Sequence, residues 1–435
     1  MGKFGGISTL NRLLSPWLSR TQKTIPQAAV ATGDPSRRQS HHQAHDLVEQ
    51  HDQQHGVEEV RIPIPYGEVA GKWWGPKNVR PVVALHGLQD NVGTFDRLIP
   101  LLPQHMSVRK HSSISFVEEC DKRNNVVEMQ IPVPYGTIAG KWYGPSDVRP
   151  VLCLHGWLDN CGSFDRLIPL LPTDRSYLAI DLPGHGRTTR IPAGTTYSMI
   201  DYMTLVMYIL RYYKWNKVSL LAHSMAANVA FAFTALFPQS VDLLICLDEL
   251  DPLSYDTDRV TAVVAASIDK IVDMHLRATG KKVAAEPPAY DYEDMIEKQY
   301  HATAGSLTRE VSPHILQRMI SPSTRHEGKY FFNGDSRIRY LTIPGWSNAI
   351  YLGLAERINA PFLAIKATES PYRESKERFD EMVALQRKVN PKFEVAYVAG
   401  NHHAHLTHPE LVEPIICDFL KRHNINPDRS IASKL

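Results

Sequence analysis

Short apolar runs recur between residues 126 and 398 and alternate with longer amphipathic stretches. The runs predict strands at 126–133, 137–143, 150–154, 177–181, 217–222, 242–248, 361–366 and 393–398. Several lack polar alternation, which is typical of strands covered on both faces. The amphipathic stretches predict helices at 199–213, 224–237, 373–389 and 409–423. This succession predicts an α/β protein with a mostly parallel eight-stranded sheet flanked by helices.

Residues 249–358 interrupt the pattern between the sixth and seventh of these strands. They include an amphipathic stretch at 259–278 that predicts a helix. A connection of this length needs structure of its own. We therefore predict a mainly helical cap, inserted after the sixth strand and placed over the carboxyl edge of the sheet, where binding sites form in such folds.

The N-terminal part of the chain carries a repeat. Residues 62–103 match residues 131–172 without gaps, at a constant offset of 69 positions. Two copies are too few for a solenoid, and only the second copy continues into an apolar strand. We predict the following organisation: a disordered tail and linker at 1–57, a partial duplicate at 58–120, a core at 121–248 and 359–424, the cap at 249–358, and a tail at 425–435.

The composition argues against several classes of protein. A net charge of +2 gives no electrostatic reason for binding nucleic acid or a membrane surface, and no apolar run is long enough for a transmembrane helix. The five cysteines are scattered without a CxxC pair, which indicates free thiols in a reducing compartment. The His-rich tract within 41–55 is interpreted as a polar linker. We expect no cofactor and no metal site.

Both ends of the sequence carry candidate targeting signals. Ser433-Lys434-Leu435 is the tripeptide of peroxisomal import, and it predicts binding to the peroxisomal import receptor. The first 23 residues are basic and lack acidic side chains, as in a mitochondrial transit peptide or a disordered basic tail. The sequence therefore predicts a peroxisomal protein, with the mitochondrion or the cytoplasm as alternatives.

Ser224 lies in "LLAHSMAA" at 220–227, between a predicted strand and a predicted helix. A sharp strand-to-helix turn exposes a serine hydroxyl as a nucleophile, and it needs small residues two positions before and after the serine. Ala222 and Ala226 stand where glycine is usual. The alternative interpretation of Ser224 is a helix cap.

The other parts of a Ser-His-acid triad follow in chain order. His402, just past the last strand, is the candidate base, and neighbouring His403 and His405 are interpreted as spare. Asp248, which ends a strand, is the preferred acid, and Glu369, which follows a later strand, is the alternative. Both lie between the serine and the histidine in chain order. The backbone N–H groups of Trp157 and Met225 are the predicted oxyanion hole.

Five segments resemble the α/β-hydrolase fold, and most closely the serine hydrolase-like (kraken-type) proteins: "HGWLDNCGSFDRLIPLLP", "DLPGHG", "LLAHSMAA", "GNHHAHL" and, in the cap, "GKYFFNGDSRIRY". The resemblance covers roughly residues 126–423 and implies Ser224 as nucleophile and His402 as base. It does not name a substrate.

Two functions are consistent with this reading. The first is a serine hydrolase acting on an ester or related small acyl substrate through the triad. The second is a non-catalytic binding or scaffold protein that keeps the fold. Ala222 and Ala226, together with the open choice of acid, motivate the second hypothesis.

Overall fold

The structure is a computed structural model that describes residues 57–64, 67–74, 120–121, 126–250, 254, 257–279, 286–340, 346–372 and 375–423. The tail at 1–56, with its basic segment and His-rich tract, and Ser433-Lys434-Leu435 lie outside the described residues. The chain divides into two compact units, one formed by Met1–Ile62 and Ala70–Ser107, the other by Pro63–Val69 and Val108–Leu435.

The two copies of the repeat form the same pair of strands. In the first copy, β1 (Val57–Ile64) and β2 (Gly67–Trp74) pair with each other in a two-stranded sheet. In the second copy, β4 (Val126–Val133) and β5 (Gly136–Tyr143) occupy the equivalent positions 69 residues later and pair antiparallel. The domain boundaries set out above remain predictions.

The main sheet has the order β13-β12-β9-β8-β6-β7-β5-β4-β3. Its strands from β13 to β7 are parallel, and β5, β4 and β3 (Cys120–Asp121) run antiparallel at one edge. The parallel strands are β6 (Val151–Leu154), β7 (Tyr177–Ile180), β8 (Val218–His223), β9 (Val241–Leu247), β12 (Phe362–Ala367) and β13 (Phe393–Val398). Each of the eight predicted strands is confirmed to within one residue at either end, and the two-residue β3 is an addition.

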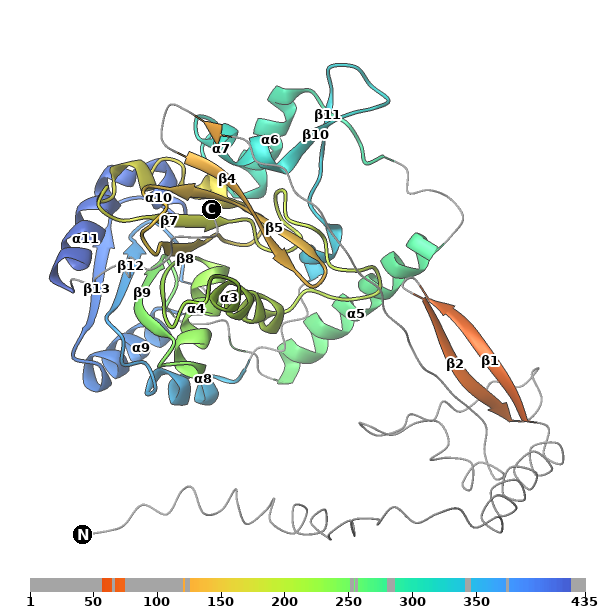
Figure 1. The fold of residues 1–435 in the computed structure, drawn as a ribbon, viewed down its shortest axis with the longest axis horizontal. Helices are drawn as coiled ribbons and strands as arrows, with labels where there is room; N and C mark the ends of the chain where they lie inside the picture. The colour runs from red at the N-terminus through yellow and green to blue at the C-terminus, as the bar shows by residue number, and fades with distance from the viewer. Residues whose placement is uncertain are drawn as a thin grey trace, which may run out of the picture. The chain divides into compact units, whose positions relative to one another are not determined.

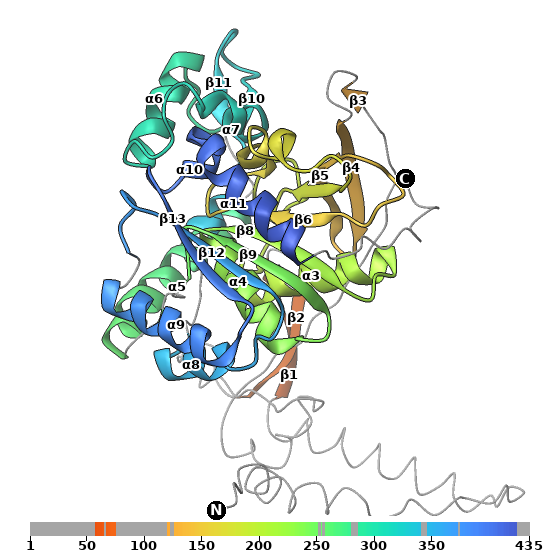
Figure 2. The same cartoon turned by 90° about the vertical axis from the view of Figure 1, so that its left-hand side faces the viewer.

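Both faces of the sheet are covered. Along β6, Leu152 and Leu154 belong to one apolar cluster, whereas Val151 and Cys153 belong to the other. The first cluster includes residues of α3 (Met199–Tyr213), α4 (Met225–Leu236), α8 (Asn348–Ala355) and α9 (Lys376–Val389). The second includes η3 (Cys161–Phe164), η4 (Ile168–Leu170), α10 (Ala404–Thr407) and α11 (Pro409–Arg422) (Figure 2). Burial on both faces explains why the strands lack polar alternation.

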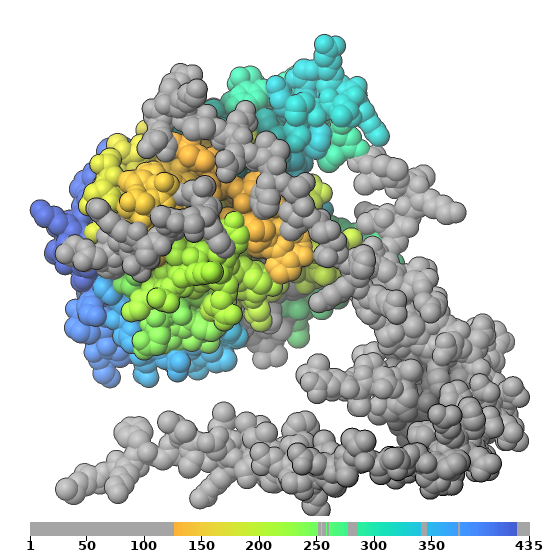
Figure 3. All heavy atoms as spheres, viewed as in Figure 1, coloured from red at the N-terminus to blue at the C-terminus, as the bar shows by residue number. Residues whose placement is uncertain are grey.

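The insertion after β9 is mainly helical, as predicted. It contains α5 (Thr257–Thr279), α6 (Tyr292–Ala302), α7 (Ser312–Met319), η5 (Ser336–Tyr340) and α8, with one short hairpin of β10 (Ile320–Pro322) and β11 (Tyr330–Phe332) (Figure 1). In the space-filling view, the cyan part of the chain, which includes β10 and β11, protrudes at the upper right (Figure 3). No helix in the described part of the chain has the length and apolar character needed to span a membrane.

A buried ion pair attaches this cap to the sheet. Arg318 at the end of α7 is only 1% exposed, and its guanidinium donates to the Asp181 carboxylate, which follows β7, at 2.9 Å. The same guanidinium contacts Glu128 on β4. The amide of Asn160 donates to the carbonyl of Ile315 in α7 at 2.8 Å. The cap is thus held at the ends of β6 and β7, beside the predicted site.

Candidate active site

Ser224 occupies a strained bend between β8 and α4. Its backbone has φ 53° and ψ −123°, a conformation that non-glycine residues rarely adopt. The Ser224 N–H donates to the Leu247 carbonyl at 3.0 Å, and the Ser224 carbonyl accepts from the Ala227 N–H at 2.8 Å. The flanking Ala222 and Ala226 are fully buried, so the small side chains are needed where strand and helix meet.

The structure brings three of the predicted site residues into hydrogen-bonding distance. The Ser224 hydroxyl lies 2.7 Å from Nε2 of His402, and Nδ1 of the same ring lies 2.6 Å from Oδ2 of Asp248. Because a carboxylate only accepts, Nδ1–H donates to Asp248 and Nε2 is free to accept the serine proton. This is the order of contacts in a Ser-His-Asp triad.

Asp248 is the carboxylate beside His402, and Glu369 is not. Glu369 is exposed, and its backbone N–H donates to the Gly400 carbonyl at 2.9 Å. Asp248 also accepts from the Lys366 ammonium at 2.9 Å and from the hydroxyl of Ser370. Ser370 and Glu369 both follow β12. The Ser370 hydroxyl donates to Asp248 and so supports the carboxylate that follows β9.

Burial and neighbouring charges set the protonation states of His402 and Asp248. Burial raises the pKa of Asp248, but the His402 hydrogen bond and the nearby Lys366 ammonium outweigh it and lower that pKa to about 2. Burial lowers the pKa of His402 to about 3, despite the hydrogen bond to Asp248. At neutral pH the pair is therefore an anionic carboxylate holding a neutral imidazole.

The predicted oxyanion-hole residues lie on two backbone segments that approach the serine. Met225 is the first residue of α4, where the helix dipole favours negative charge. Trp157 follows Gly156, at which an added Cβ would lie 3.2 Å from Cβ of Ser224. The Trp157 indole donates to the Ile338 carbonyl of η5 at 2.8 Å, which joins this loop to the cap. The oxyanion role of both N–H groups remains a prediction.

Two buried histidines hold the loop that carries Trp157. His155 accepts from the Leu182 N–H at 2.9 Å through Nε2, and its Nδ1 lies 2.7 Å from the Gly156 carbonyl. His185 accepts from the Leu158 N–H at 3.2 Å, and burial lowers its pKa to about 3. Both rings act as neutral connectors between loops. The sequence around His185 is equally typical of an ordinary turn, so it does not predict that this ring connects two loops.

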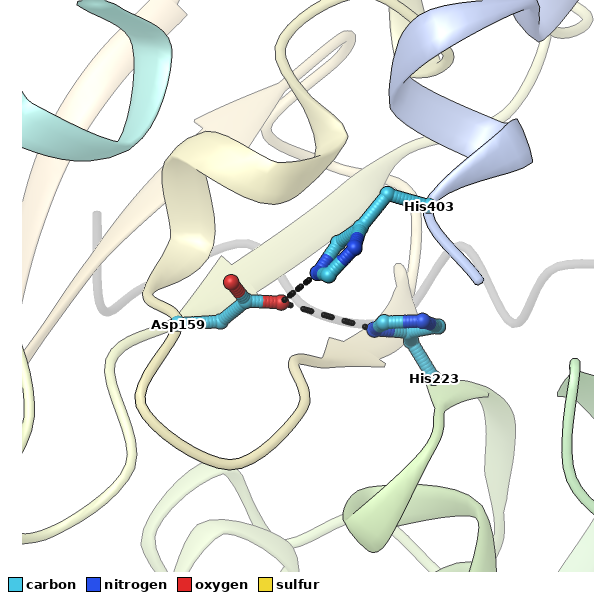
Figure 4. A group of neighbouring side chains, drawn as sticks. All are labelled: Asp159, His223 and His403. Carbon is cyan, nitrogen blue, oxygen red and sulfur yellow. Dashed lines mark ion pairs between the residues drawn. The ribbon is translucent and has the colours of Figure 1, made fainter. Parts of the chain in front are cut away.

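A second polar cluster lies beside the triad and was missed by sequence reasoning. Asp159, His223 and His403 are buried and face one another (Figure 4). His405, also buried, lies 2.8 Å from the Ser163 hydroxyl through Nε2. The interpretation of His403 and His405 as spare beside His402 stays a prediction, and the structure shows that both side chains are buried. Their positions next to His402 were the available signal, but their partner Asp159 is over 240 residues away in the chain.

Comparison with known sequences places this chain in a family. The family model described as alpha/beta hydrolase fold matches residues 149–276. The chain is 35% identical over 295 residues to a "Probable serine hydrolase" of Drosophila melanogaster, covering 68% of this chain and 87% of the relative. It is 32% identical over 305 residues to the "Serine hydrolase-like protein" of Mus musculus, covering 68% and 95% respectively.

Solved structures agree on the fold. A hypothetical protein of Pseudomonas aeruginosa PAO1 is 28% identical, with a TM-score of 0.57 over 68% of this chain and 99% of that protein. The thioesterase domain from the curacin biosynthetic pathway has a TM-score of 0.54, covering 67% of this chain and 99% of that domain, at 19% identity. The latter likeness concerns the fold alone.

Proposed function

Because the chain belongs to the serine hydrolase-like group of the α/β-hydrolase fold family, we propose that it is a serine hydrolase acting on an ester or related small acyl compound. The observation that carries the proposal is the relay from Ser224 through His402 to Asp248, with contacts of 2.7 and 2.6 Å. Dehalogenase and epoxide hydrolase chemistry on this fold would need a carboxylate nucleophile, and the residue at the elbow is a serine.

In this mechanism Nε2 of His402 removes the proton from Ser224 as Oγ bonds to the substrate carbonyl carbon. The carbonyl oxygen becomes an oxyanion, and the N–H groups of Trp157 and Met225 stabilise it. The same imidazole then gives its proton to the leaving alcohol oxygen as the carbon–oxygen bond breaks. Water, deprotonated by His402, then bonds to the acyl carbon. The bond between that carbon and Oγ breaks as His402 returns the proton to Oγ, which releases the carboxylic acid and restores Ser224. Asp248 stabilises the imidazolium at both stages.

A fluorophosphonate probe tests this function directly, since it reacts with activated serine hydroxyls regardless of substrate. We expect the full chain to be labelled at one site and Ser224→Ala to be unlabelled. Ser163→Ala, which removes another buried serine, should still be labelled. Folded wild-type protein that takes no label would instead favour the non-catalytic binding or scaffold protein.

We also propose that the protein is peroxisomal and that the import receptor recognises Ser433-Lys434-Leu435. Deleting these three residues from a chain tagged at its N-terminus should abolish peroxisomal localisation in cells. If the shortened chain is found in mitochondria, the basic N-terminal segment becomes the better candidate signal, and an unchanged peroxisomal location would contradict the proposal.

A further inference from the structure

Three ionisable side chains meet at a point that the proposed mechanism does not use (Figure 4). Oδ2 of Asp159 lies 3.4 Å from Nδ1 of His223 and 3.4 Å from Nε2 of His403. The three candidate ligand atoms are all within 4.8 Å of one another. All three side chains are more than nine-tenths buried.

The hydrogen bond on the far side of His223 fixes which nitrogen is free. Nε2 of His223 lies 2.8 Å from the carbonyl oxygen of His402, and a carbonyl only accepts, so Nε2 carries the proton. In the neutral ring Nδ1 then presents a lone pair. It has no hydrogen-bond partner among the described residues, and it faces the Asp159 carboxylate. A lone pair and a carboxylate facing each other in a buried space repel unless a proton or a metal cation lies between them.

His403 is arranged in the same sense. Its Nδ1 lies 2.5 Å from the Ser306 hydroxyl in the cap, which can accept the Nδ1 proton. Nε2 is then the lone-pair nitrogen, and it faces Asp159. A histidine that ligates a metal commonly donates its other N–H to such an outer partner. Ser163 donates to Oδ2 of Asp159 at 3.3 Å, which orients the carboxylate.

The distances match a small metal ion. Zinc bonds of about 2.0–2.2 Å to nitrogen and oxygen place neighbouring ligands of a tetrahedron about 3.3–3.5 Å apart. Both contacts of Asp159 are 3.4 Å. Two imidazole nitrogens with one carboxylate are a ligand set that suits zinc and related divalent transition metals.

We propose that Asp159, His223 and His403 bind one divalent transition-metal ion of the zinc type. None of the three ligands belongs to the Ser224–His402–Asp248 relay, so the ion would act on the position of the reacting groups and not in the reaction itself. Asp159 follows the loop of Trp157, His223 immediately precedes Ser224, and His403 immediately follows His402. One ion would therefore join the three segments that carry the oxyanion hole, the nucleophile and the base. The site does not depend on the proposed hydrolase activity.

The pKa of His223 is consistent with this site. Burial lowers it, which favours the neutral ring, and a metal-binding imidazole must be deprotonated at the ligating nitrogen.

The test measures zinc bound per chain by equilibrium dialysis of chelator-treated full-length protein. The N-terminal histidines would add background, so the parent protein carries glutamine at positions 41, 42, 45, 51 and 55. We expect one saturable equivalent of zinc and a rise in Tm when zinc is added. Asp159→Asn and His403→Gln should lose that equivalent. Ser306→Ala, which removes only the outer partner of His403, should weaken binding on the order of 10–100-fold.

Two controls separate the site from general effects. His301→Gln removes an exposed histidine of α6 and should bind zinc like the parent. Ser224→Ala should also bind zinc normally, so a failure of the hydrolase proposal would leave this result intact. Absence of a saturable equivalent in the parent, or unchanged binding in folded Asp159→Asn or Ser306→Ala, would overturn the proposal. In that case a protonated His223 paired with Asp159 would account for the cluster.

Discussion

At the residue scale, Asp248 decides how His402 is held. It receives the Nδ1–H of His402, the Lys366 ammonium and the Ala367 N–H, and its own backbone has a φ of 54°. A carboxylate with this many donors stays ionised and fixes the tautomer of the imidazole. The exposed Glu369 has no comparable setting.

The variants Asp248→Asn and Glu369→Gln are therefore expected to differ sharply in their rates of fluorophosphonate labelling. The asparagine cannot stabilise the imidazolium, and the rate of fluorophosphonate labelling should fall by a factor on the order of 10⁴. Glu369→Gln should label at the wild-type rate. Labelling that depends on Glu369 and tolerates Asp248→Asn would show that the other carboxylate serves His402.

Gly156 gives a second residue-scale prediction. An added Cβ there would lie 2.9 Å from Nδ1 of His223 and 3.2 Å from Cβ of Ser224. Gly156→Ala should displace the elbow and slow labelling roughly 10–100-fold, as small misplacements of catalytic groups do. Gly353→Ala in α8 is the matched control, because nothing lies within 4 Å of its new methyl group. Equal labelling rates in the two variants would contradict this account of the close approach.

At the element scale, a buried ion pair is one of the contacts that attach the cap to the sheet. Arg318 of α7 and Asp181 after β7 are 1% and 0% exposed in their side chains. Asp181 also accepts from the N–H groups of Cys161 and Arg187, so one carboxylate connects the cap, η3 and the turn after β7. Removing one partner of such a pair leaves a buried charge without compensation.

Asp181→Asn should lower the free energy of unfolding by about 3–5 kcal/mol at neutral pH. Asp380→Asn, in an exposed pair with Lys376, is the matched control and should change it by less than about 1 kcal/mol. Urea unfolding of the three proteins measures both values. A loss for Asp181→Asn as small as that of the control would contradict the anchoring role.

The stabilisation that Asp181 contributes to the wild-type protein depends on pH. Burial raises the pKa of Asp181, but Arg318 and the backbone donors outweigh it, so the folded-state pKa lies below the usual value. The stabilisation is therefore complete above the unfolded-state pKa of about 3.9 and is lost as pH falls through the folded-state pKa. The stability difference between wild type and Asp181→Asn should persist at pH 5–7 and shrink below about pH 4. A stability difference that grows as the pH falls would contradict the expected direction of this pH dependence.

At the scale of the whole molecule, we predict that the duplicated segment is separable from the main sheet and its covering helices. The main sheet, its covering helices and the Ser224–His402–Asp248 relay all come from residues after 119. A chain lacking residues 1–120 loses only Cys120 from the two-residue β3. It should melt cooperatively and retain fluorophosphonate labelling. Loss of the cooperative transition would show that the first repeat copy contributes to the core.

Much of the fold was predictable because its signals are local. Apolar runs bounded by turn residues located the strands to within one residue. The amphipathic stretch at 199–213 predicted a helix, and α3 is observed at those bounds. Ser224 was found from the small residues around it, and His402 from its place after the last strand. Each of these assignments depends on residues within about ten positions of one another. At that range the sequence pattern itself produces the strand, turn or helix that it predicts.

The sequence by itself therefore determined the order of strands and helices and the place of the cap, and it indicated Ser224 and His402 as the candidate nucleophile and base. Only the tertiary structure decided between Asp248 and Glu369, because both carboxylates keep the required chain order and the choice depends on which one reaches His402. The cluster of Asp159, His223 and His403 was likewise decided by topology. Asp159 follows β6 and His223 ends β8, and these two strands are neighbours in the sheet, whereas His403 follows β13, from which β9 and β12 separate them. The chain order does not show that the segment after β13 reaches the other two residues.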